Sequence, residues 1–452
     1  MQIIIVGCGK VGTALAVQLS QEDNNVTVVD KDSTVIRNIT SMYDVMGIVG
    51  NGASYGTLKE ADIEHADLLI AVSRSDELNL LCCVIAHQAA KCHTIARVRN
   101  SVYREEREFI RRELGLSMII NPEFAAAQEM ARLLRFPTAI EIDSFSKGRI
   151  EMLRFKVPPA SRLVGMQLKD VSGPRNDLLI CVAERNREVV IPDGNYRIDA
   201  NDSLSLLATP KTASGFFRKI GVKTNQVHST MIVGGGETTY YLAAILLRMG
   251  IHVTIIEKNR ERCEVLSEHL QDATIICGDG SDQELLKEEN LENMESFVAC
   301  TDMDEENIIL SLYAKDKVSK KVVTKINHLN FNDVIHSLNL DSLVYPKYIT
   351  AETILQYVRA MKNSMGSNVE TLYKLMDDRV EALEFIIREN CPLQNITLES
   401  MKTKKNVLVA CINRRGRIII PGGQDSFRAG DSVIVVTTHT GLENIEDILD
   451  EK

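Results

Sequence analysis

The sequence predicts an α/β protein with two doubly wound parallel-sheet domains, each followed by a small α+β domain. Over residues 1 to about 120, short apolar strands alternate with helical segments, which is typical of a parallel sheet covered by helices on both faces. An apolar strand runs into a Gly-rich turn twice, as MQIIIVGCGKVG at 1–12 and as STMIVGGGETT at 229–239. The segment REVVIPDGNYRIDANDSLSLLAT at 187–209 is likewise similar to GRIIIPGGQDSFRAGDSVIVVTT at 416–438. We therefore expect the plan of one large and one small domain to occur twice.

Further landmarks recur at a nearly constant distance, which indicates two homologous halves. Gly234 follows Gly7 by 227 positions, and Glu257 follows Asp30 by the same number. GNGAS at 50–54 matches GDGSD at 278–282, and AVSRSDELN at 71–79 matches ACTDMDEEN at 299–307. The predicted domains are 1–136, 137–212, 226–364 and 370–452.

The first half contains a candidate for each strand and helix of this plan. The expected strands are Ile3–Val6, Val26–Val29, Asp44–Val49, Leu68–Val72 and Thr94–Val98. The expected helices are Thr13–Leu19, Ser33–Ser41, Glu77–Ala90, Val102–Leu114 and Pro122–Leu134. The small domain should hold the short strands IEMLRFKV, LLICVAER, REVVIP and SLSLLAT. The last two helices, one highly charged and one rich in Ala, are expected to mediate contacts between subunits.

The first Gly-rich turn has the chemistry of a dinucleotide site. Gly7, Gly9 and Gly12 form G-x-G-x-x-G directly after a strand, which permits a tight turn, a close approach of pyrophosphate and close packing of the helix. The following helix presents free N–H groups to the phosphate. Asp30 has the spacing of an acid that accepts hydrogen bonds from both ribose hydroxyls, and its charge favours NAD over NADP. These features predict a Rossmann-like nucleotide site, and a turn kept only for packing is the alternative.

The carboxyl ends of the later strands should supply the remaining contacts, because ligands bind there in doubly wound sheets. Asn51 and Gly52 are expected to flank adenine, Ser73 and Arg74 to touch ribose or phosphate, and Arg97 to bind a phosphate. Ordinary loop polarity is the alternative for each of these residues alone. The candidate residues of the first site are Gly7, Cys8, Gly9, Lys10, Val11, Gly12, Asp30, Asn51, Gly52, Ser73, Arg74 and Arg97.

The second turn is degraded, so we expect it to bind nucleotide more weakly or to be a structural relic. Thr239 stands at the third glycine position, which should move helix and strand slightly apart, and Glu237 places a carboxylate near the expected phosphate. The candidate residues of the second site are Gly234, Gly235, Gly236, Glu237, Thr238, Glu257, Asp279 and Lys325.

Composition excludes several classes of function. The net charge of −10 argues against a nucleic-acid partner. No apolar run approaches the roughly 18–20 residues of a membrane span, and the chain begins with a strand, so we expect no signal peptide. The ten cysteines are scattered without a C-x-x-C motif, which predicts small buried side chains in a reducing cytoplasm rather than disulfides or a metal site.

The order of these motifs resembles that of the RCK (KTN) family. GCGKVG, Asp30, GNGAS, AVSRSDELN and IARVRN are followed by a small domain similar to RCK-C, with VVIPDG and GD-containing turns. A tandem chain of this length looks like the TrkA-type regulatory subunits of bacterial Trk potassium-uptake systems, and the resemblance covers nearly all 452 residues.

This resemblance implies a non-catalytic sensor of NAD(H), or of ATP or ADP, that regulates potassium flux. It also implies a cytoplasmic protein on the inner face of the cell membrane, assembled as a homo-oligomeric ring on a membrane potassium-transporting subunit. The family's nucleotide positions carry over to the candidate residues named above in both halves. The departures at Glu237 and Thr239 leave the ligand of the second site open.

Two other functions remain as alternatives. An NAD-dependent oxidoreductase would need a proton donor, and we find no strand-end His or Tyr/Lys arrangement for hydride transfer and no dedicated substrate domain. A metabolite sensor without a membrane partner is the other alternative.

Overall fold

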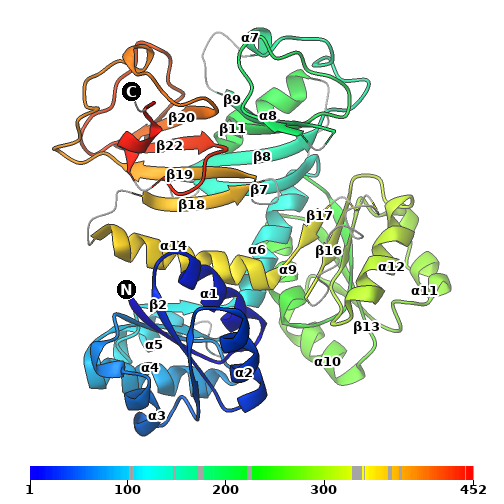
Figure 1. The fold of residues 1–452 in the computed structure, drawn as a ribbon. Coiled ribbons are helices and arrows are strands. Elements are labelled where there is room, and N and C mark those ends of the chain that lie inside the picture. The colour runs from blue at the N-terminus through cyan, green and yellow to red at the C-terminus, as the bar shows by residue number, and fades with distance from the viewer. Residues whose placement is uncertain are drawn as a thin grey trace. The chain divides into compact units, whose positions relative to one another are not determined.

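The computed structural model describes residues 1–100, 103, 106–145, 149–171, 178–186, 188–220, 226–327, 338, 340, 342–364, 369–375, 379–442 and 444–450. The chain forms two compact units. Met1–Ala131 and His228–Leu355 make up the parallel-sheet unit, and Arg132–Val227 and Gln356–Lys452 make up the antiparallel-sheet unit. Each unit contains two similar sheets, one from each half of the chain (Figure 1).

The first parallel sheet has the strand order β3-β2-β1-β4-β5-β6. Its strands are β1 (Gln2–Val6), β2 (Asn25–Asp30), β3 (Met46–Val49), β4 (Leu68–Ala71), β5 (His93–Arg97) and β6 (Met118–Ile120). The helices are α1 (Lys10–Gln21), α2 (Ser33–Met42), α3 (Tyr55–Glu60), α4 (Asp76–Ala90), α5 (Arg107–Glu113) and α6 (Pro122–Arg135), with a 3-10 turn at Ile63–His65.

The second parallel sheet repeats this order as β14-β13-β12-β15-β16-β17. Its strands are β12 (Ser229–Val233), β13 (His252–Glu257), β14 (Thr274–Cys277), β15 (Ser296–Ala299), β16 (Lys321–Lys325) and β17 (Ser342–Val344). The helices are α9 (Glu237–Arg248), α10 (Arg260–His269), α11 (Gln283–Glu288), α12 (Asp304–Lys315) and α14 (Pro346–Ser364), with a 3-10 turn at Leu291–Asn293.

Central strands that are apolar on both faces form the cores of these domains. All four residues of β4 are buried, as are four of the five in β1. Helix α1 covers them with Leu15, Ala16 and Leu19, whose side chains are fully buried. Burial of each Leu or Ile side chain stabilises the fold by about 1.5–3 kcal/mol, so these strands anchor the turn that follows β1.

The structure confirms the predicted α/β fold class and adds elements that the sequence pattern did not predict. Strands β6 and β17 have only three residues each, which is too short for a recognisable period. The predicted helix 102–114 begins at Arg107, and residues 101–102 and 104–105 lie outside the described residues. No residue of α5 is buried, whereas α6 buries Ala126, Ala127 and Met130 within the chain.

The two antiparallel sheets have strand orders that mirror each other, β10-β9-β11-β8-β7 and β18-β19-β22-β20-β21. The first contains β7 (Ala139–Phe145), β8 (Ile150–Lys156), β9 (Leu178–Arg185), β10 (Glu188–Val190) and β11 (Ser203–Ala208), with helices α7 (Leu168–Val171) and α8 (Pro210–Lys219). The second contains β18 (Val369–Leu375), β19 (Val380–Ile386), β20 (Val407–Arg414), β21 (Arg417–Ile419) and β22 (Ser432–Thr437), with 3-10 turns at Leu398–Ser400 and Ile445–Ile448. The predicted boundaries at 212–226 and 364–370 include residues outside the described ranges, so the exact boundaries stay predictions.

Both antiparallel sheets contribute to one shared apolar core. Phe145, Cys181 and Leu207 of the first sheet pack in the same cluster as Ala382 and Cys411 of the second. Strands β7 and β18 belong to these sheets, although the sequence analysis did not recognise either of them. The small domains therefore form one folded unit, because each covers an apolar face of the other.

An ionic contact also joins the two antiparallel sheets. Glu184 of β9 accepts hydrogen bonds at 2.7 Å from Arg379, which precedes β19, and from Arg154 of β8. Burial alone would raise the pKa of Glu184, but the two guanidinium groups hold this pKa below its usual value. The charged carboxylate is therefore the form that stabilises the unit.

We predict that Glu184→Gln lowers the free energy of unfolding at pH 7 by about 1–3 kcal/mol, as expected for hydrogen bonds to a charged group. Because the pKa of Glu184 is depressed in the fold, its contribution is complete above about pH 4.3 and is lost as the pH falls through the lower folded pKa. Urea unfolding at several pH values measures this, and the difference between the two proteins should shrink in acid. The exposed Glu188 offers a control, Glu188→Gln. Equal effects of the two substitutions would contradict the role of the contact.

Candidate functional site

The first Gly-rich turn brings the end of β1 against the end of β4. Gly7 has φ = +95°, a left-handed conformation that favours glycine. A Cβ at Gly7 would lie 2.7 Å from the backbone nitrogen of Ser73, which follows β4. A Cβ at Gly12 would overlap the carbonyl oxygen of Gly7. These two glycines are therefore required by the fold itself.

Gly9 has a different environment, because no described atom lies within 4 Å of where its Cβ would be. It is the N-cap residue of α1 and makes no side-chain capping hydrogen bond. The N–H groups of the first helical turn need partners from outside the helix, and they carry the positive end of its dipole. The backbone at Gly9 thus leaves open space in front of a helix terminus that attracts an anion.

Asp30 fixes the shape of this turn from the end of β2. Its Oδ2 accepts a hydrogen bond from the Cys8 N–H at 2.7 Å, and its Oδ1 accepts one from the Asp32 N–H at 3.0 Å. Cys8 is buried, and its pKa is raised to about 12 by burial and by Asp30, so its thiol stays protonated. Each carboxylate oxygen of Asp30 keeps acceptor capacity for a further donor, such as a ribose hydroxyl.

A buried asparagine aligns the ends of β4 and β5. The amide oxygen of Asn79 accepts from the Ser73 N–H at 2.8 Å, and its Nδ2 donates to the carbonyl oxygens of Ser73 and Arg97. Asn307 makes the equivalent three contacts in the second half, with Thr301 and Lys325. The sequence analysis missed both asparagines, although each ends one copy of the repeated AVSRSDELN and ACTDMDEEN motif.

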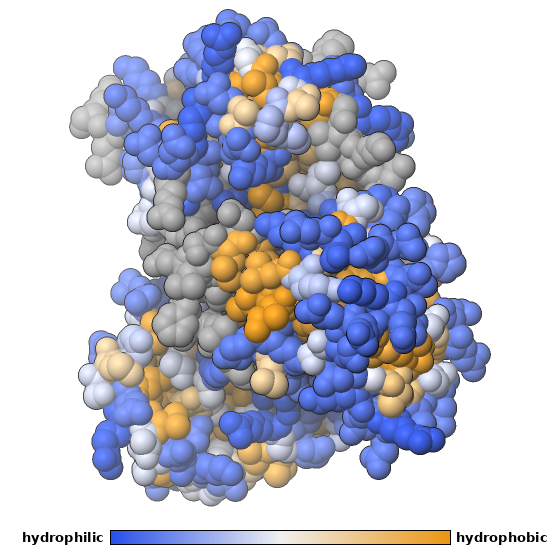
Figure 2. Space-filling view, turned by 90° about the vertical axis from the view of Figure 1, so that its right-hand side faces the viewer, coloured by the Kyte–Doolittle hydropathy of each residue, from blue (hydrophilic) through white to orange (hydrophobic). Residues whose placement is uncertain are grey.

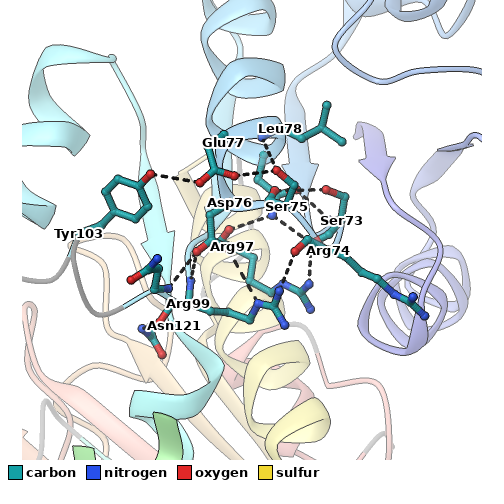
Figure 3. A network of polar contacts seen from close by, with 12 residues as sticks. Ser73, Arg74, Ser75, Asp76, Glu77, Leu78, Arg97, Arg99, Tyr103 and Asn121 are labelled. Atoms are coloured by element: carbon teal, nitrogen blue, oxygen red, sulfur yellow. Dashed lines mark hydrogen bonds and ion pairs between the residues drawn. The ribbon is translucent and has the colours of Figure 1, made fainter. Parts of the chain in front are cut away.

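Three arginines lie in one polar network (Figure 3), in which Arg74 follows β4, Arg97 ends β5 and Arg99 follows β5. Arg97 donates to the Ser73 carbonyl oxygen at 2.5 Å, and Arg99 donates to that of Arg74 at 2.6 Å. The Asp76 carboxylate accepts from the backbone N–H of Arg99 at 2.9 Å and lies 3.9 Å from its Nε. Asp76 and Arg99 were also missed by the sequence analysis, which named only Ser73, Arg74 and Arg97.

This arginine cluster is incompletely neutralised. Burial lowers the pKa of Arg97, and the neighbouring Arg99 lowers it further, while Glu123 and Asp76 oppose the shift. Burial raises the pKa of Glu123, which weakens the compensation that this acid provides. The buried Nε of Arg97 has no hydrogen-bond partner among the described residues. An anion bound beside Arg97 would therefore stabilise its charged form.

The remaining candidates of the first site surround the turn. Lys10 begins α1, and its electrostatic neighbours are Lys347 and Asp304 of the second parallel-sheet domain. Burial and then Lys347 lower the pKa of Lys10, whereas Asp304 raises it. Asn51 is exposed, while the backbone of Gly52 packs on Val6, whose side chain a Cβ at Gly52 would overlap. The Asn51 Oδ1 accepts a hydrogen bond from the Ala53 N–H at 3.1 Å, and Gly52 contributes by its small size.

The second turn has nearly the same backbone as the first. Gly234 has φ = +100°, and Gly236 caps α9 with φ = −65°, close to the −67° of Gly9. Thr239 is buried at the third glycine position, and its hydroxyl donates to the Gly234 carbonyl oxygen at 2.5 Å. This hydrogen bond lets a threonine replace the glycine without changing the turn conformation.

The acid of the second site is longer, and the turn accommodates it. Glu257 accepts from the Gly235 N–H at 2.6 Å and from the Asn259 N–H at 2.7 Å, as Asp30 does in the first half. A Cβ at Gly235 would lie 2.9 Å from the Cγ of Glu257. Gly235 stands where the first turn has Cys8, so the extra methylene of Glu257 occupies the space of that missing side chain.

Two cations of the second site each lie close to an acid. The sequence predicts a carboxylate near the expected phosphate at Glu237, and in the structure the Arg262 Nη2 lies 3.1 Å from its Oε1. The Arg262 Nε also donates to the Gly235 carbonyl oxygen at 2.6 Å, so the guanidinium lies directly on the turn. Lys325, the counterpart of Arg97, is buried and lies 3.7 Å from Asp302, the counterpart of Arg74.

Asp279 takes the place of Asn51 in the second site and adds a further negative charge. Its Oδ1 accepts from the N–H and the hydroxyl of Ser281 at 2.9 and 2.8 Å. These hydrogen bonds lower its pKa, so it is ionised at neutral pH. Thr238 lies buried in the first turn of α9. The second site therefore has carboxylates at Glu237 and Asp279 where the first site has Lys10 and Asn51.

The two parallel-sheet domains meet beside the first site. The Tyr241 hydroxyl of α9 accepts from Asn121 Nδ2 at 3.2 Å and donates to the Arg99 carbonyl oxygen at 3.4 Å. Its ring packs edge-on against Phe124 of α6, with 5.4 Å between ring centroids. Tyr241 follows the second Gly-rich turn closely, so this contact links the helix of one turn to the arginine cluster of the other.

Two further features of the described residues bear on function. No group of three or more His, Cys, Asp or Glu side chains among them could hold a metal ion. Over the same residues, no helix has the length and hydropathy needed to cross a membrane.

Family comparisons match all four domains. The TrkA-N domain model matches residues 3–122 and 230–346, and the TrkA-C domain model matches residues 152–221 and 382–450. The Trk system potassium uptake protein TrkA homolog 1 of Methanosarcina mazei is 31% identical, over 99% of each chain. The Trk system potassium uptake protein TrkA of Haemophilus influenzae is 29% identical, over 96% of this chain and 95% of that chain.

Solved structures share the fold. The GsuK channel has a TM-score of 0.65 at 16% identity and covers 99% of this chain and 77% of that chain. The GsuK channel bound to NAD has a TM-score of 0.63 at 17% identity and covers 96% of this chain and 76% of that one. These likenesses confirm the α/β fold class expected from the sequence.

Proposed function

Because the chain belongs to the TrkA family, we propose that it is a nucleotide-sensing regulatory subunit that controls potassium uptake through a membrane partner. The observation that carries this proposal is the first turn, where no described atom fills the space at Gly9 and the buried Nε of Arg97 has no hydrogen-bond partner among the described residues. A dinucleotide offers the matching chemistry, with an anionic pyrophosphate for the helix terminus and ribose hydroxyls for Asp30.

Asp30, at the end of β2, favours some nucleotides over others as the ligand. Asp30 is held by the N–H groups of Cys8 and Asp32, so it cannot turn away from an approaching ribose. Its negative charge would repel a 2′-phosphate, which favours NAD(H) over the phosphorylated dinucleotide. ATP and ADP carry the same ribose hydroxyls and are the alternative ligands. The likeness to a channel solved with NAD makes NADH the first probe to use.

The proposed partner is a membrane potassium-transporting subunit of the Trk type. Relatives that match this chain from end to end are named as proteins of a potassium uptake system. We further propose a cytoplasmic location on the inner face of the membrane and a homo-oligomeric ring. Exposed apolar side chains suit such contacts, namely Leu81 of α4 and Ile309 and Leu312 of α12. Figure 2, viewed from the side of α12, shows apolar patches on a largely hydrophilic surface.

Ligand binding would act through the contact between the two parallel-sheet domains. A ligand shifts a conformational equilibrium only if it binds one state more tightly than the other. The arginine cluster of the first site also holds Tyr241 of the second domain through the Arg99 carbonyl oxygen. A nucleotide that draws Arg97 and Arg99 toward its phosphates would therefore change how the two domains pack.

An NAD-dependent oxidoreductase remains the competing function. The two proposals differ in whether NADH is consumed, so incubation of the purified chain with NADH and a panel of carbonyl substrates separates them. Oxidation of NADH that depends on such a substrate would favour the enzyme.

We predict that Gly9→Glu weakens NADH binding to the chain by more than about a hundredfold. A side chain at this position meets no protein atom, so the fold should persist while the carboxylate occupies the phosphate position. Loss of two charge-assisted hydrogen bonds, each worth about 1.5–3 kcal/mol, accounts for this magnitude. Isothermal titration calorimetry measures the affinity.

The matched control is Gly236→Glu, because Gly236 has the same backbone conformation and the same open surroundings in the second turn. It should change the tightest NADH affinity by less than about threefold. Loss of tight binding in Gly236→Glu, with binding retained in Gly9→Glu, would reverse the proposed ranking of the two sites.

A second prediction concerns the membrane partner. Affinity purification of the tagged full-length chain from solubilised membranes should retain a potassium-transporting membrane protein, identified by mass spectrometry. The proposal predicts that NADH changes the retained amount of this protein for the wild type and not for Gly9→Glu. Recovery of the chain from the soluble fraction alone, with no transporter bound, would favour a sensor without a membrane partner.

A further inference from the structure

Two cysteines of the second parallel-sheet domain, Cys263 and Cys277, both lie beside the acid of the second site, Glu257. Cys277 ends β14 and is the ladder partner of Glu257 at the end of β13. Cys263, in α10, donates its S–H to the Glu257 carbonyl oxygen at 3.2 Å. Cys277 also contributes to the electrostatic environment of the Cys263 thiol. Both cysteines are thus placed beside Glu257, Cys277 as its ladder partner and Cys263 through its sulfur.

The exposure of Cys277 distinguishes this pair from the other cysteines. The sequence predicts buried cysteines, which is right for eight of the ten and wrong for Cys277, which is exposed. Other cysteines also lie near one another, in the groups Cys82, Cys83 and Cys92 and Cys181 with Cys411. All members of those groups are buried, so an oxidant in solution cannot reach them.

We propose that Cys263 and Cys277 form a redox-active thiol pair that a low-molecular-weight disulfide, such as oxidised glutathione, converts to an intramolecular disulfide. The inference goes beyond the proposed function and does not depend on it. Cytoplasmic disulfides that form transiently are usually catalytic or redox-sensing, which fits a pair that is free in the resting protein.

The exchange balances in two steps. The exposed Cys277 loses its proton and attacks one sulfur of the oxidant, which forms a mixed disulfide and releases one thiolate. Cys263 then loses its proton and attacks the Cys277 sulfur, which forms the protein disulfide and releases the second thiolate. The two cysteines are oxidised by two electrons in total, and the low-molecular-weight disulfide is reduced to two thiols.

The order of these steps follows from the surroundings of each thiol. Burial, together with the neighbouring Cys277, raises the pKa of Cys263 to about 11, so little of its reactive thiolate exists at neutral pH. Cys263 therefore acts second, when the mixed disulfide is already held against it. Oxidation also removes the S–H that donates to the Glu257 carbonyl oxygen, so the backbone of this acid loses one hydrogen bond.

The test is to equilibrate the full-length native chain with mixtures of reduced and oxidised glutathione. After quenching in acid, free thiols are alkylated and the peptides are mapped by mass spectrometry. The proposal predicts one cross-linked peptide that joins Cys263 to Cys277, lighter by two hydrogen atoms and reversed by reduced glutathione. Formation of this cross-link only in urea would overturn the proposal, as would its absence at every glutathione ratio.

Two variants test whether the cross-link requires Cys277. Cys277→Ser should abolish the cross-link, while Cys391→Ser, which removes a partly exposed cysteine of the antiparallel-sheet unit, should leave it unchanged. Stable attachment of glutathione to Cys277 in the wild type, without transfer to Cys263, would show that the second step fails and would overturn the pair. The wild-type peptide map shows whether the disulfide between Cys263 and Cys277 forms, even if a variant folds poorly.

Discussion

The hydrogen bond between a strand-end carboxylate and a turn N–H is the contact on which both candidate sites depend. Asp30 holds the N–H of Cys8, and Glu257 holds that of Gly235. The contact joins the end of the second strand to the Gly-rich turn after the first, so the helix terminus and the acid face the same space. The second half keeps this hydrogen bond although Glu257 is longer than Asp30, because residue 235 is a glycine and leaves room for the extra methylene. The geometry of the turn is therefore the same in both halves.

The two halves share this turn geometry but differ in the charged residues around the turn. Lys10 begins α1 in the first domain, where the second has Glu237, and Arg74 follows β4, where the second has Asp302. In the second domain each cation lies against an acid, Arg262 with Glu237 and Lys325 with Asp302. An incoming pyrophosphate would have to displace these ion pairs, whereas the arginines after β4 and β5 gain a counter-charge from it. On this basis we propose the first turn as the nucleotide site.

The sequence predicts much of this fold and part of the site, for identifiable physical reasons. Strand periodicity and the repeated glycines locate the turns, and the recurrent spacing locates Asp30 and Glu257, because these features are local in the chain. The pairing of Glu237 with Arg262 depends on how α10 approaches the turn, which no local pattern encodes. Strands β7 and β18 were not predicted, although each pairs with the strand that follows it in the chain, and the exposure of Cys277 follows from its place on an edge strand.

The central claim, that charge on a shared frame determines which turn binds nucleotide, can be tested by giving the second site the residues of the first. The variant Glu237→Lys, Arg262→Val and Asp302→Arg reproduces Lys10, Val35 and Arg74 at the equivalent positions. Calorimetric titration with NADH should show one tight site per chain in the wild type and two in this variant. An unchanged single tight site in a correctly folded variant would contradict the account, because features other than charge would then distinguish the two turns.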